Sequence, residues 1–445
     1  MSTLLALTLV ASATTSAPLP RDTPLPRDAP LTLDAALALA NAERPLVAAA
    51  LADVRAAEAR VREAEAPRWP SLNGTGAYAL QTANFIARPG ALPSTLAAQR
   101  TGASFDLFGF WNFGLTASYV IWDFGAIAGN VSSAEATAVG AEATLAATRG
   151  DVELAVRTQF AAVGAQAALA EVARAAVEAA ARREVQIARM VEVGTKPEVD
   201  LAQARSDRAA AQLKGVQAEN AERQARSELL RVLGLRGDRP LALAGDPATL
   251  VPQVEGEDGP LDALLAESGS RSELRVLGAQ ATSIDARRDA AWAAFFPSLG
   301  VATGFTTQGP ALDALTWNVN GQLTLSWSIF SGFSTVALLS ELDASRASLE
   351  AQRRERALTI EAEVRSAALA IRAAKAQRAS ASEVDRLSKE RLRLAEGRYG
   401  VGVGTIIELS DAQAAAIDGA SQRVQADFQL AVGRAQLLHA LGRLR

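Results

Sequence analysis

The chain has 445 residues, of which 49% are hydrophobic and 21% are charged, and its net charge is −4. This composition is that of a folded protein with room for more than one structural unit, and it lacks the basic excess that binds a phosphate backbone, which argues against nucleic acid as a partner. The sequence contains no cysteine and one histidine, His439, which excludes disulfides and thiolate metal sites and argues against an enzyme. We expect no cofactor, and we interpret His439 as a packing or surface residue.

The first 17 residues resemble a secretory signal peptide. An apolar run from Leu4 to Val10 is followed by Ala11-Ser12-Ala13, a small-x-small pattern of the kind found at cleavage sites. No Lys or Arg precedes the run, so either the true start lies upstream or the signal is weak, and a frayed apolar terminus is the alternative. Residues 18–30 contain a duplicated PLPRD and predict an extended linker.

The remainder of the chain contains two copies of one pattern. Leu229 and its neighbours recur 208 positions later at Leu437, whereas Trp69-Pro70-Ser71-Leu72 recurs 227 positions later as Phe296-Pro297-Ser298-Leu299. The first copy therefore has 19 additional residues, which we place in the polar segment from Ala83 to Gly109, a loop by its chemistry.

Each copy predicts two helices, two strands separated by a loop, and two longer helices. In the first copy, residues 31–234, we expect helices at 32–43 and 46–66, strands at 70–81 and 111–123, and helices at 125–193 and 197–233. A non-helical connector follows at 235–260. In the second copy, residues 261–445, we expect helices at 262–268 and 273–293, strands at 297–308 and 317–330, and helices at 334–399 and 406–441.

The four predicted strands differ from the rest of the chain in aromatic content and charge. All six Trp, eleven of thirteen Phe and two of three Tyr lie within 69–124 or 292–333, and no charged residue occurs in 107–122 or 314–340. Apolar and small polar side chains alternate there, which excludes a transmembrane helix, and strands of this length suit a tilted bilayer crossing. We therefore predict membrane strands rather than a soluble sheet with one buried face, carrying the aromatic residues Trp69, Trp111, Tyr119, Trp122, Trp317, Trp327 and Phe330.

Four strands cannot close a barrel, and an open edge in lipid leaves backbone amides unsatisfied. Two chains would give eight strands and a filled interior, whereas three would give twelve and leave a lumen, so three copies suit a conduit better. The predicted helix at 125–193 would span on the order of 100 Å at about 1.5 Å per residue. Such helices would project from the membrane and continue the tube. A detached periplasmic coiled coil is the alternative, but it does not explain the strands.

Several motifs are similar to those of a known family. They are Trp69-Pro70-Ser71-Leu72 and Phe296-Pro297-Ser298-Leu299 at the start of each hairpin, Ile329-Phe330-Ser331-Gly332 at the end of the second, and GVGVGTIIELSDAQAA from Gly400. From about residue 31 to the C-terminus, the chain resembles the TolC family of outer membrane efflux channels. The resemblance implies a mainly α-helical homotrimer with a shared 12-stranded β-barrel in the outer membrane and a long helical tunnel through the periplasm.

The resemblance also implies an entrance to the tunnel at the helix-turn-helix tips, 193–205 and 399–412. Asp200, Glu408 and Asp411 would form acidic rings that favour cations, and Tyr399 would belong to a gate network. Acids in the first turn of a helix also oppose the helix dipole, which explains Glu408 about as well. The family's basic gate residue would fall at Gly404. The turn residues expected to contact an adaptor protein are Val193, Gly194, Thr195, Val401, Gly402, Val403, Gly404 and Thr405.

These features together predict a passive channel of a tripartite efflux or type I secretion system, in the outer membrane of a Gram-negative-type bacterium. The partners implied by the resemblance are outer membrane lipid, a periplasmic adaptor protein and an inner-membrane pump or ABC exporter. An outer-membrane-anchored periplasmic coiled-coil protein with a structural role and no transport activity is the alternative.

Overall fold

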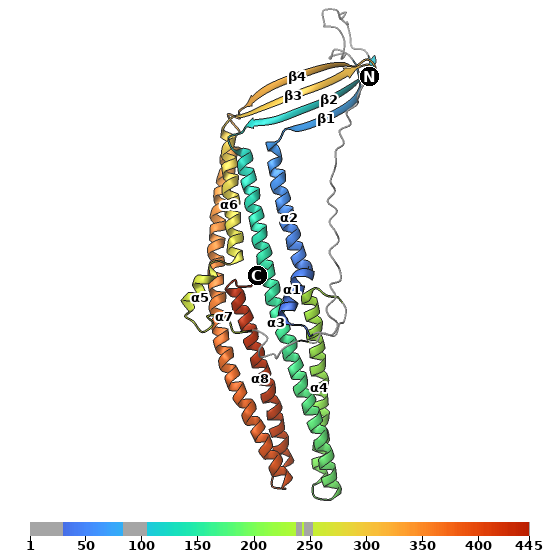
Figure 1. Cartoon of the computed structure of the whole chain (residues 1–445), viewed down its shortest axis with the longest axis vertical. Helices are drawn as coiled ribbons and strands as arrows, with labels where there is room; N and C mark the ends of the chain where they lie inside the picture. Colours follow the sequence, from blue (N-terminus) through green and yellow to red (C-terminus); the bar gives the residue numbers. More distant parts are fainter. Residues whose placement is uncertain (1–29, 83–104, 237–242, 244–251, 445) are drawn as a thin grey trace, which may run out of the picture.

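The computed structural model describes residues 30–82, 105–236, 243 and 252–444. Within these residues the molecule is elongated, with a four-stranded sheet across one end of a long set of helices (Figure 1). The expected signal peptide, all but the last residue of the linker, and most of the predicted insertion lie outside the described residues.

Two 67-residue helices run along most of the molecule, and shorter helices lie beside them in pairs (Figure 1). Every helix begins and ends within one residue of the expected range. The long helices are α3 (Ala126–Glu192) and α7 (Ser334–Gly400). Near the sheet lie α2 (Pro45–Glu65) and α6 (Ser272–Trp292), and at the far end lie α4 (Glu198–Leu233) and α8 (Ile406–Ala440). The two short helices near the middle are α1 (Leu33–Glu43) and α5 (Leu261–Ser268).

Local sequence signals set the helix ends. The Thr32 hydroxyl accepts a hydrogen bond from the Ala35 amide at 3.3 Å and so caps α1. Pro45 occupies the start of α2, where its missing N–H leaves no bond unmade. Gly234 follows α4 with a φ of 79°, a left-handed conformation that suits glycine at a helix end.

The helices pack through narrow seams rather than around one globular core. α7 buries Ile360, Val364, Ala367 and Ile371, a 4-3-4 spacing typical of a coiled-coil seam. Small residues let the partner helix approach, since a Cβ built on Gly433 of α8 would lie 3.4 Å from Ile371. Each pair of antiparallel helices can therefore extend far from the sheet while burying its apolar stripe.

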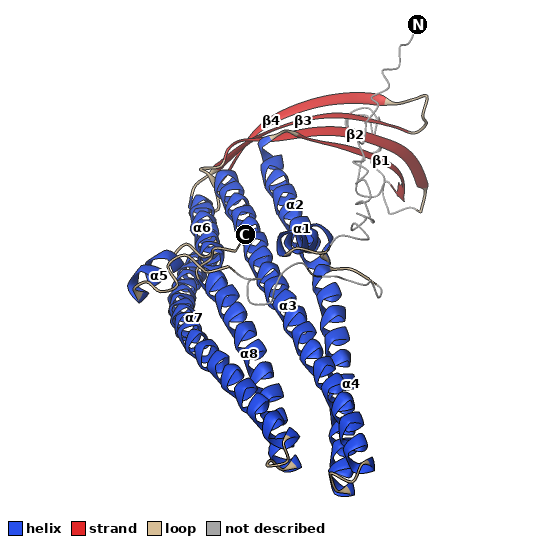
Figure 2. Ribbon diagram, turned by 60° about the horizontal axis from the view of Figure 1, so that its bottom comes forward, coloured by secondary structure: helices blue, strands red, loops and turns tan. Residues whose placement is uncertain are grey.

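The four strands form one antiparallel sheet in the order β1-β2-β3-β4 (Figure 2). They are β1 (Ser71–Thr82), β2 (Leu107–Trp122), β3 (Ser298–Gly309) and β4 (Thr316–Ser326), and none of them contains a charged residue. β1 and β4 are the outer strands of this sheet. Within the described part of a single chain, both outer edges therefore lack a neighbouring strand.

The end of β4 differs from the prediction. The strand ends at Ser326 instead of 330, so Trp327 and Phe330 lie in the link to α7. Alternation of apolar and polar residues continues past Ser326, but its partner Ser298 is the first residue of β3. Pro297 comes before it and has no N–H to donate, so the ladder stops there.

The start of β2 also differs. The strand begins at Leu107 instead of 111, because residues 79–82 of β1 continue the ladder opposite 107–110. The predicted loop to Gly109 is therefore too long by three residues at this end. Trp69 precedes β1 and lies at the end of the short 3₁₀ turn Ala66–Arg68.

One described helix is long and apolar enough to cross a bilayer by composition alone, and that helix is α3. α1 and the segment Pro45–Arg68 would pass the same test as one unit bent by 50°. α3 packs along α2, α4, α6 and α8, and 39% of its most apolar stretch is buried within the chain.

Candidate functional site: the helix tips and the sheet

The turn between α3 and α4 is closed by two backbone hydrogen bonds. The Gly194 amide donates to the Val191 carbonyl and the Thr195 amide donates to the Met190 carbonyl, each at 2.9 Å. This is the Schellman arrangement, which requires a left-handed residue after the helix, and Gly194 supplies it with a φ of 78°.

The turn between α7 and α8 is built in the same way. The amides of Gly402 and Val403 donate to the carbonyls of Tyr399 and Arg398 at 3.1 Å, and Gly402 has a φ of 84°. The Thr405 hydroxyl then caps α8. At the two tips the predicted adaptor-contact residues are exposed, apart from the half-buried Gly404: Val193, Gly194, Thr195, Val401, Gly402, Val403 and Thr405.

Behind the turns, Tyr399 and Asp200 join the two helix hairpins. The Tyr399 hydroxyl donates to Asp200 Oδ2 at 2.8 Å, and the two residues are only 4% and 7% exposed. Burial, with the hydrogen bond to Asp200 and its charge, raises the pKa of Tyr399, so the phenol remains a donor. Lys196 Nζ lies 4.0 Å from the centre of the Tyr399 ring and adds a cation–π contact. The structure therefore brings together two predicted site residues that are 199 positions apart.

The other two predicted acids lie on α8 and are more accessible. Asp411 is exposed, whereas Glu408 is half-buried and lies 3.4 Å from the Arg398 guanidinium. The amide of Glu408 is held by the Thr405 hydroxyl at 3.1 Å. Glu408 and Asp411 are about one turn apart, so both carboxylates belong to the start of α8, separate from the buried Asp200.

Further polar contacts between the hairpins were not predicted from the sequence. The Ser410 hydroxyl donates to Asp207 at 2.6 Å, and Arg183 lies 3.2 Å from Glu396. Such residues resemble the solvated polar face of any helix, because their partners lie on distant parts of the chain. No spacing in the sequence identifies these pairs.

The sheet presents an apolar face that none of the described helices covers. The register places Phe113 of β2 opposite Gly76 and Thr307, and Leu115 opposite Gly74 and Phe305, so alternate residues share this face. Tyr78 and Trp111 lie across from one another with ring centres 4.9 Å apart. Of the predicted membrane aromatics, Trp111 is half-buried and the others are exposed: Trp69, Tyr119, Trp122, Trp317, Trp327 and Phe330.

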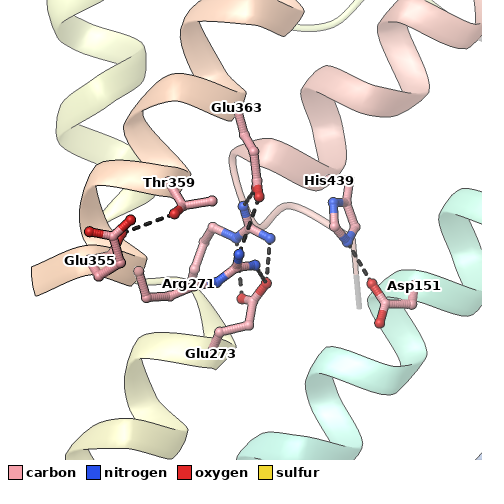
Figure 3. Close-up of polar contacts among 8 residues, drawn as sticks. Asp151, Arg271, Glu273, Glu355, Thr359, Glu363 and His439 are labelled. Atoms are coloured by element: carbon pink, nitrogen blue, oxygen red, sulfur yellow. Dashed lines mark hydrogen bonds and ion pairs between the residues drawn. The ribbon is translucent and has the colours of Figure 1, made fainter. Parts of the chain in front are cut away.

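Near the middle of the molecule, charged residues connect the helices (Figure 3). Arg271, the residue before α6, is 2% exposed and is paired with Glu273 and Glu363. Arg356 of α7 contacts the same two carboxylates at 3.0 and 3.3 Å. This cluster fixes the start of α6 to α7.

The single histidine makes a polar contact between two helices. His439 Nε2 lies 2.8 Å from Asp151 Oδ1, which connects the end of α8 to α3 (Figure 3). In the part of the chain that the structure describes, no group of three or more histidine and acidic side chains is arranged to hold a metal ion.

Known proteins share the fold of this chain. A family model described as outer membrane efflux protein matches residues 36–235 and 268–443. No curated protein matches. Similar solved structures include CusC (18% identity, TM-score 0.77, 92% of each chain covered), a membrane protein from Pseudomonas aeruginosa (21%, 0.77, 92% of each) and the CmeC outer membrane channel of Campylobacter jejuni (16%, 0.76, 92% of this chain and 85% of that one).

At these identities the solved structures show the fold, which is a helical tunnel portion joined to strands of a barrel portion, as expected from the sequence. The family match extends over more than half of the chain. The chain therefore belongs to the outer membrane efflux protein family, to which the TolC-type channels belong.

Proposed function

We propose that this protein is the outer membrane channel of a tripartite efflux or type I secretion system. Three copies form a passive conduit, with a shared 12-stranded barrel in the outer membrane and a helical tunnel in the periplasm. An inner-membrane pump or ABC exporter supplies the energy and the cargo. A periplasmic adaptor protein docks at the exposed tips and connects the pump to the tunnel.

The open, uncharged sheet carries this proposal. Within the described residues of one chain, β1 and β4 have no further strand at their outer edges, and one face of the sheet exposes large apolar side chains such as Trp317 (70%) and Leu323 (67%). In water such a sheet would aggregate, and in lipid each unpaired amide would cost several kcal/mol. Both problems are removed when β4 of one copy pairs with β1 of the next and the apolar face contacts lipid.

The tips supply an entrance that can be closed. The bond between Tyr399 and Asp200 holds the two hairpins of one chain together at the narrow end. Separating the hairpins breaks this bond, so a docked adaptor that binds the separated form better would shift the tips toward it. Glu408 and Asp411 would add solvent-facing negative charge to the same entrance.

Two measurements on the purified full-length protein test the proposal. Light scattering in detergent should give the mass of three chains, and insertion into a planar bilayer should give discrete ion-conducting steps. An inserted trimer without any ion current would support the anchored coiled-coil alternative instead. A water-soluble monomer that does not enter detergent or vesicles would contradict both.

The acidic entrance has its own test. Replacing Glu408 and Asp411 together by alanine should weaken the cation preference of the bilayer current and its block by multivalent cations, because three copies remove six carboxylates. Asp262→Ala, an exposed acid on α5 far from the tips, is the matched control and should change neither property. Equal selectivity in all variants would refute the acidic ring and leave the channel intact.

A further inference from the structure

The polar face of the sheet carries two phenylalanines at one end. Phe108 and Phe110 pair with Gln81 and Ala79 of β1, so they lie on the face opposite to Phe113. Further along β2 this polar face continues with small or polar residues: Asn112, Gly114, Thr116 and Ser118. Apart from Val120 near the other end of β2, the two phenylalanines are the large apolar residues that interrupt this face of the strand.

Phe108 and Phe110, which we call the phenylalanine pair, lie in the first four residues of β2, and β2 begins at the end of the sheet farthest from the helices (Figure 1). β3 ends at Gly309, which pairs with Trp111, so the pair belongs to a part of the β1–β2 hairpin that extends past β3. The two rings stack with centres 5.9 Å apart at 23°, and both residues are half-buried. The pair thus forms a small, ordered apolar surface at the outer end of the polar face.

The opposite face already supplies the aromatic residues that lipid would contact at this level, namely Tyr78 and Trp111. The pair must therefore serve the inner side of the barrel. A 12-stranded barrel with strands about 4.8 Å apart and tilted by about 40° has a backbone diameter of roughly 24 Å. Inward phenylalanines, each reaching about 6 Å, would reduce this opening to roughly half.

We infer that Phe108 and Phe110, six rings in three chains, form a hydrophobic constriction at the outer mouth of the lumen. The inference rests on the proposed function, because it needs the shared barrel. An apolar ring of this kind disfavours hydrated ions and large polar solutes, whereas cargo with apolar surface can contact the rings as it leaves. The constriction would limit entry from outside independently of the helix tips.

The natural absence of cysteine gives a clean test. Asn320 lies on the polar face in the row of Thr116 and Gly304, three rows deeper than Phe110, and serves as the reporter position. In Asn320→Cys trimers in vesicles, a bulky, charged, membrane-impermeant thiol reagent is added from the side of the sheet hairpins. With Phe108→Ala and Phe110→Ala added, labelling of this cysteine should become about fivefold faster or more.

Two further variants make the result specific. Phe113→Ala, a phenylalanine on the same strand but on the lipid-facing side, should leave the labelling rate unchanged. Phe110→Trp, which enlarges the ring, should slow labelling even if the double alanine variant fails to assemble. If the cysteine is labelled at the same rate in the natural background, in the double alanine variant and in Phe110→Trp, the constriction is refuted, although labelling itself would still show a water-filled lumen. No labelling of Asn320→Cys in any background would instead contradict the proposed barrel.

Discussion

In both repeats, two helices meet end to end near the middle of the molecule, but different interactions hold the two contacts together. In each, the helix near the sheet begins beside the end of a helix from the far half. An arginine precedes that beginning, Arg44 before α2 and Arg271 before α6, and a left-handed glycine follows the other helix, Gly234 after α4 and Gly442 after α8. We call Arg44 with Gly234 the first joint, and Arg271 with Gly442 the second joint.

The joints differ in how the guanidinium is satisfied. In the first, Arg44 Nη1 donates to the Val232 carbonyl at 3.3 Å, in the negatively polarised last turn of α4. Burial, and then repulsion from Arg231, lowers the pKa of Arg44. The apolar cluster in this region of the chain includes Ala40, from the helix before Arg44, and Leu233, the last residue of α4.

In the second joint Arg271 is paired with two carboxylates. Burial alone would raise the pKa of Glu273, but hydrogen bonds from its own backbone amide and from Arg271 outweigh burial and hold the pKa below its ordinary value. The two repeats thus keep a buried or partly buried arginine at the same place, but its charge is balanced by a backbone carbonyl in one and by carboxylates in the other. The first joint depends mainly on packing, and the second depends on an ion-pair cluster.

Removing a carboxylate from the second joint should give the largest effect. Glu273→Ala leaves Arg271 buried with Glu363 alone, at an expected cost of about 3 kcal/mol in the local opening free energy. Arg44→Ala, the matched change at the first joint, removes one bond to a carbonyl and should cost about 1 kcal/mol. Amide hydrogen exchange in α6 and in α2 measures the two opening free energies. Equal losses of opening free energy in the two variants would contradict the difference between the joints.

For glycine-to-alanine changes the order should be reversed, and the first joint should lose more stability than the second. A Cβ on Gly234 would lie 2.8 Å from the Glu43 carbonyl oxygen, whereas one on Gly442 would lie 3.2 Å from Cγ of the Arg271 side chain. Both changes to alanine incur the left-handed penalty of about 1 kcal/mol, and only Gly234→Ala adds a clash with backbone. Exchange at the ends of α4 and α8 should therefore rise more for Gly234→Ala. A larger effect of Gly442→Ala would refute the packing of the first joint.

The tips give the smallest expected effect. Tyr399 of the second repeat corresponds to Val191 of the first at the same 208-residue shift, so only one hairpin supplies the hydroxyl. Tyr399→Phe should weaken the tip by about 1 kcal/mol, roughly a fivefold increase in opening, because Asp200 loses its buried donor. Hydrogen exchange in residues 193–205 reports this loss, and Val401→Ala, a change to an exposed side chain two positions after Tyr399, is the control and should leave exchange there unchanged.

The raised pKa of Tyr399 gives the same contact a pH dependence. The folded tip favours the neutral phenol, so its contribution is complete below the ordinary tyrosine pKa of about 10 and is lost as pH rises toward the raised value. Once the exchange rates are divided by the intrinsic, base-catalysed rates at each pH, opening of the tip should therefore increase above about pH 10 in the natural protein, and Tyr399→Phe should remove that increase. An identical alkaline response in the variant would contradict the role of the hydroxyl.

The sequence predicted the elements well because their signals are local. Helical composition and glycine turns mark the helices, and two-residue alternation without charge marks the strands. Alternation continues through Trp327 and Ile329, however, and it cannot show that β3 offers no partner there. Strand ends depend on the neighbouring strand, which local pattern does not contain.

Residues with distant partners were the least predictable part of the site. Asp200 stands in the first turn of α4, where an acid is expected to be solvated, and only the fold shows that Tyr399 buries it. Arg271 resembles a surface residue at a helix start, yet Glu363 lies 92 positions away in α7. In both cases the sequence gives the residue type but not the partner that determines its burial.

The central claim, that three copies share one barrel, can be tested most directly at the open edges of the sheet. A chain with one cysteine at Asn73 on β1 and a second at Asn318, Asn320 or Gln322 on β4 in turn places both thiols on the polar face of opposite edges. If neighbouring copies pair through these edges, mild oxidation should give covalent trimers for at least one pairing. Inserted protein that remains monomeric on denaturing gels for every pairing would contradict the shared barrel.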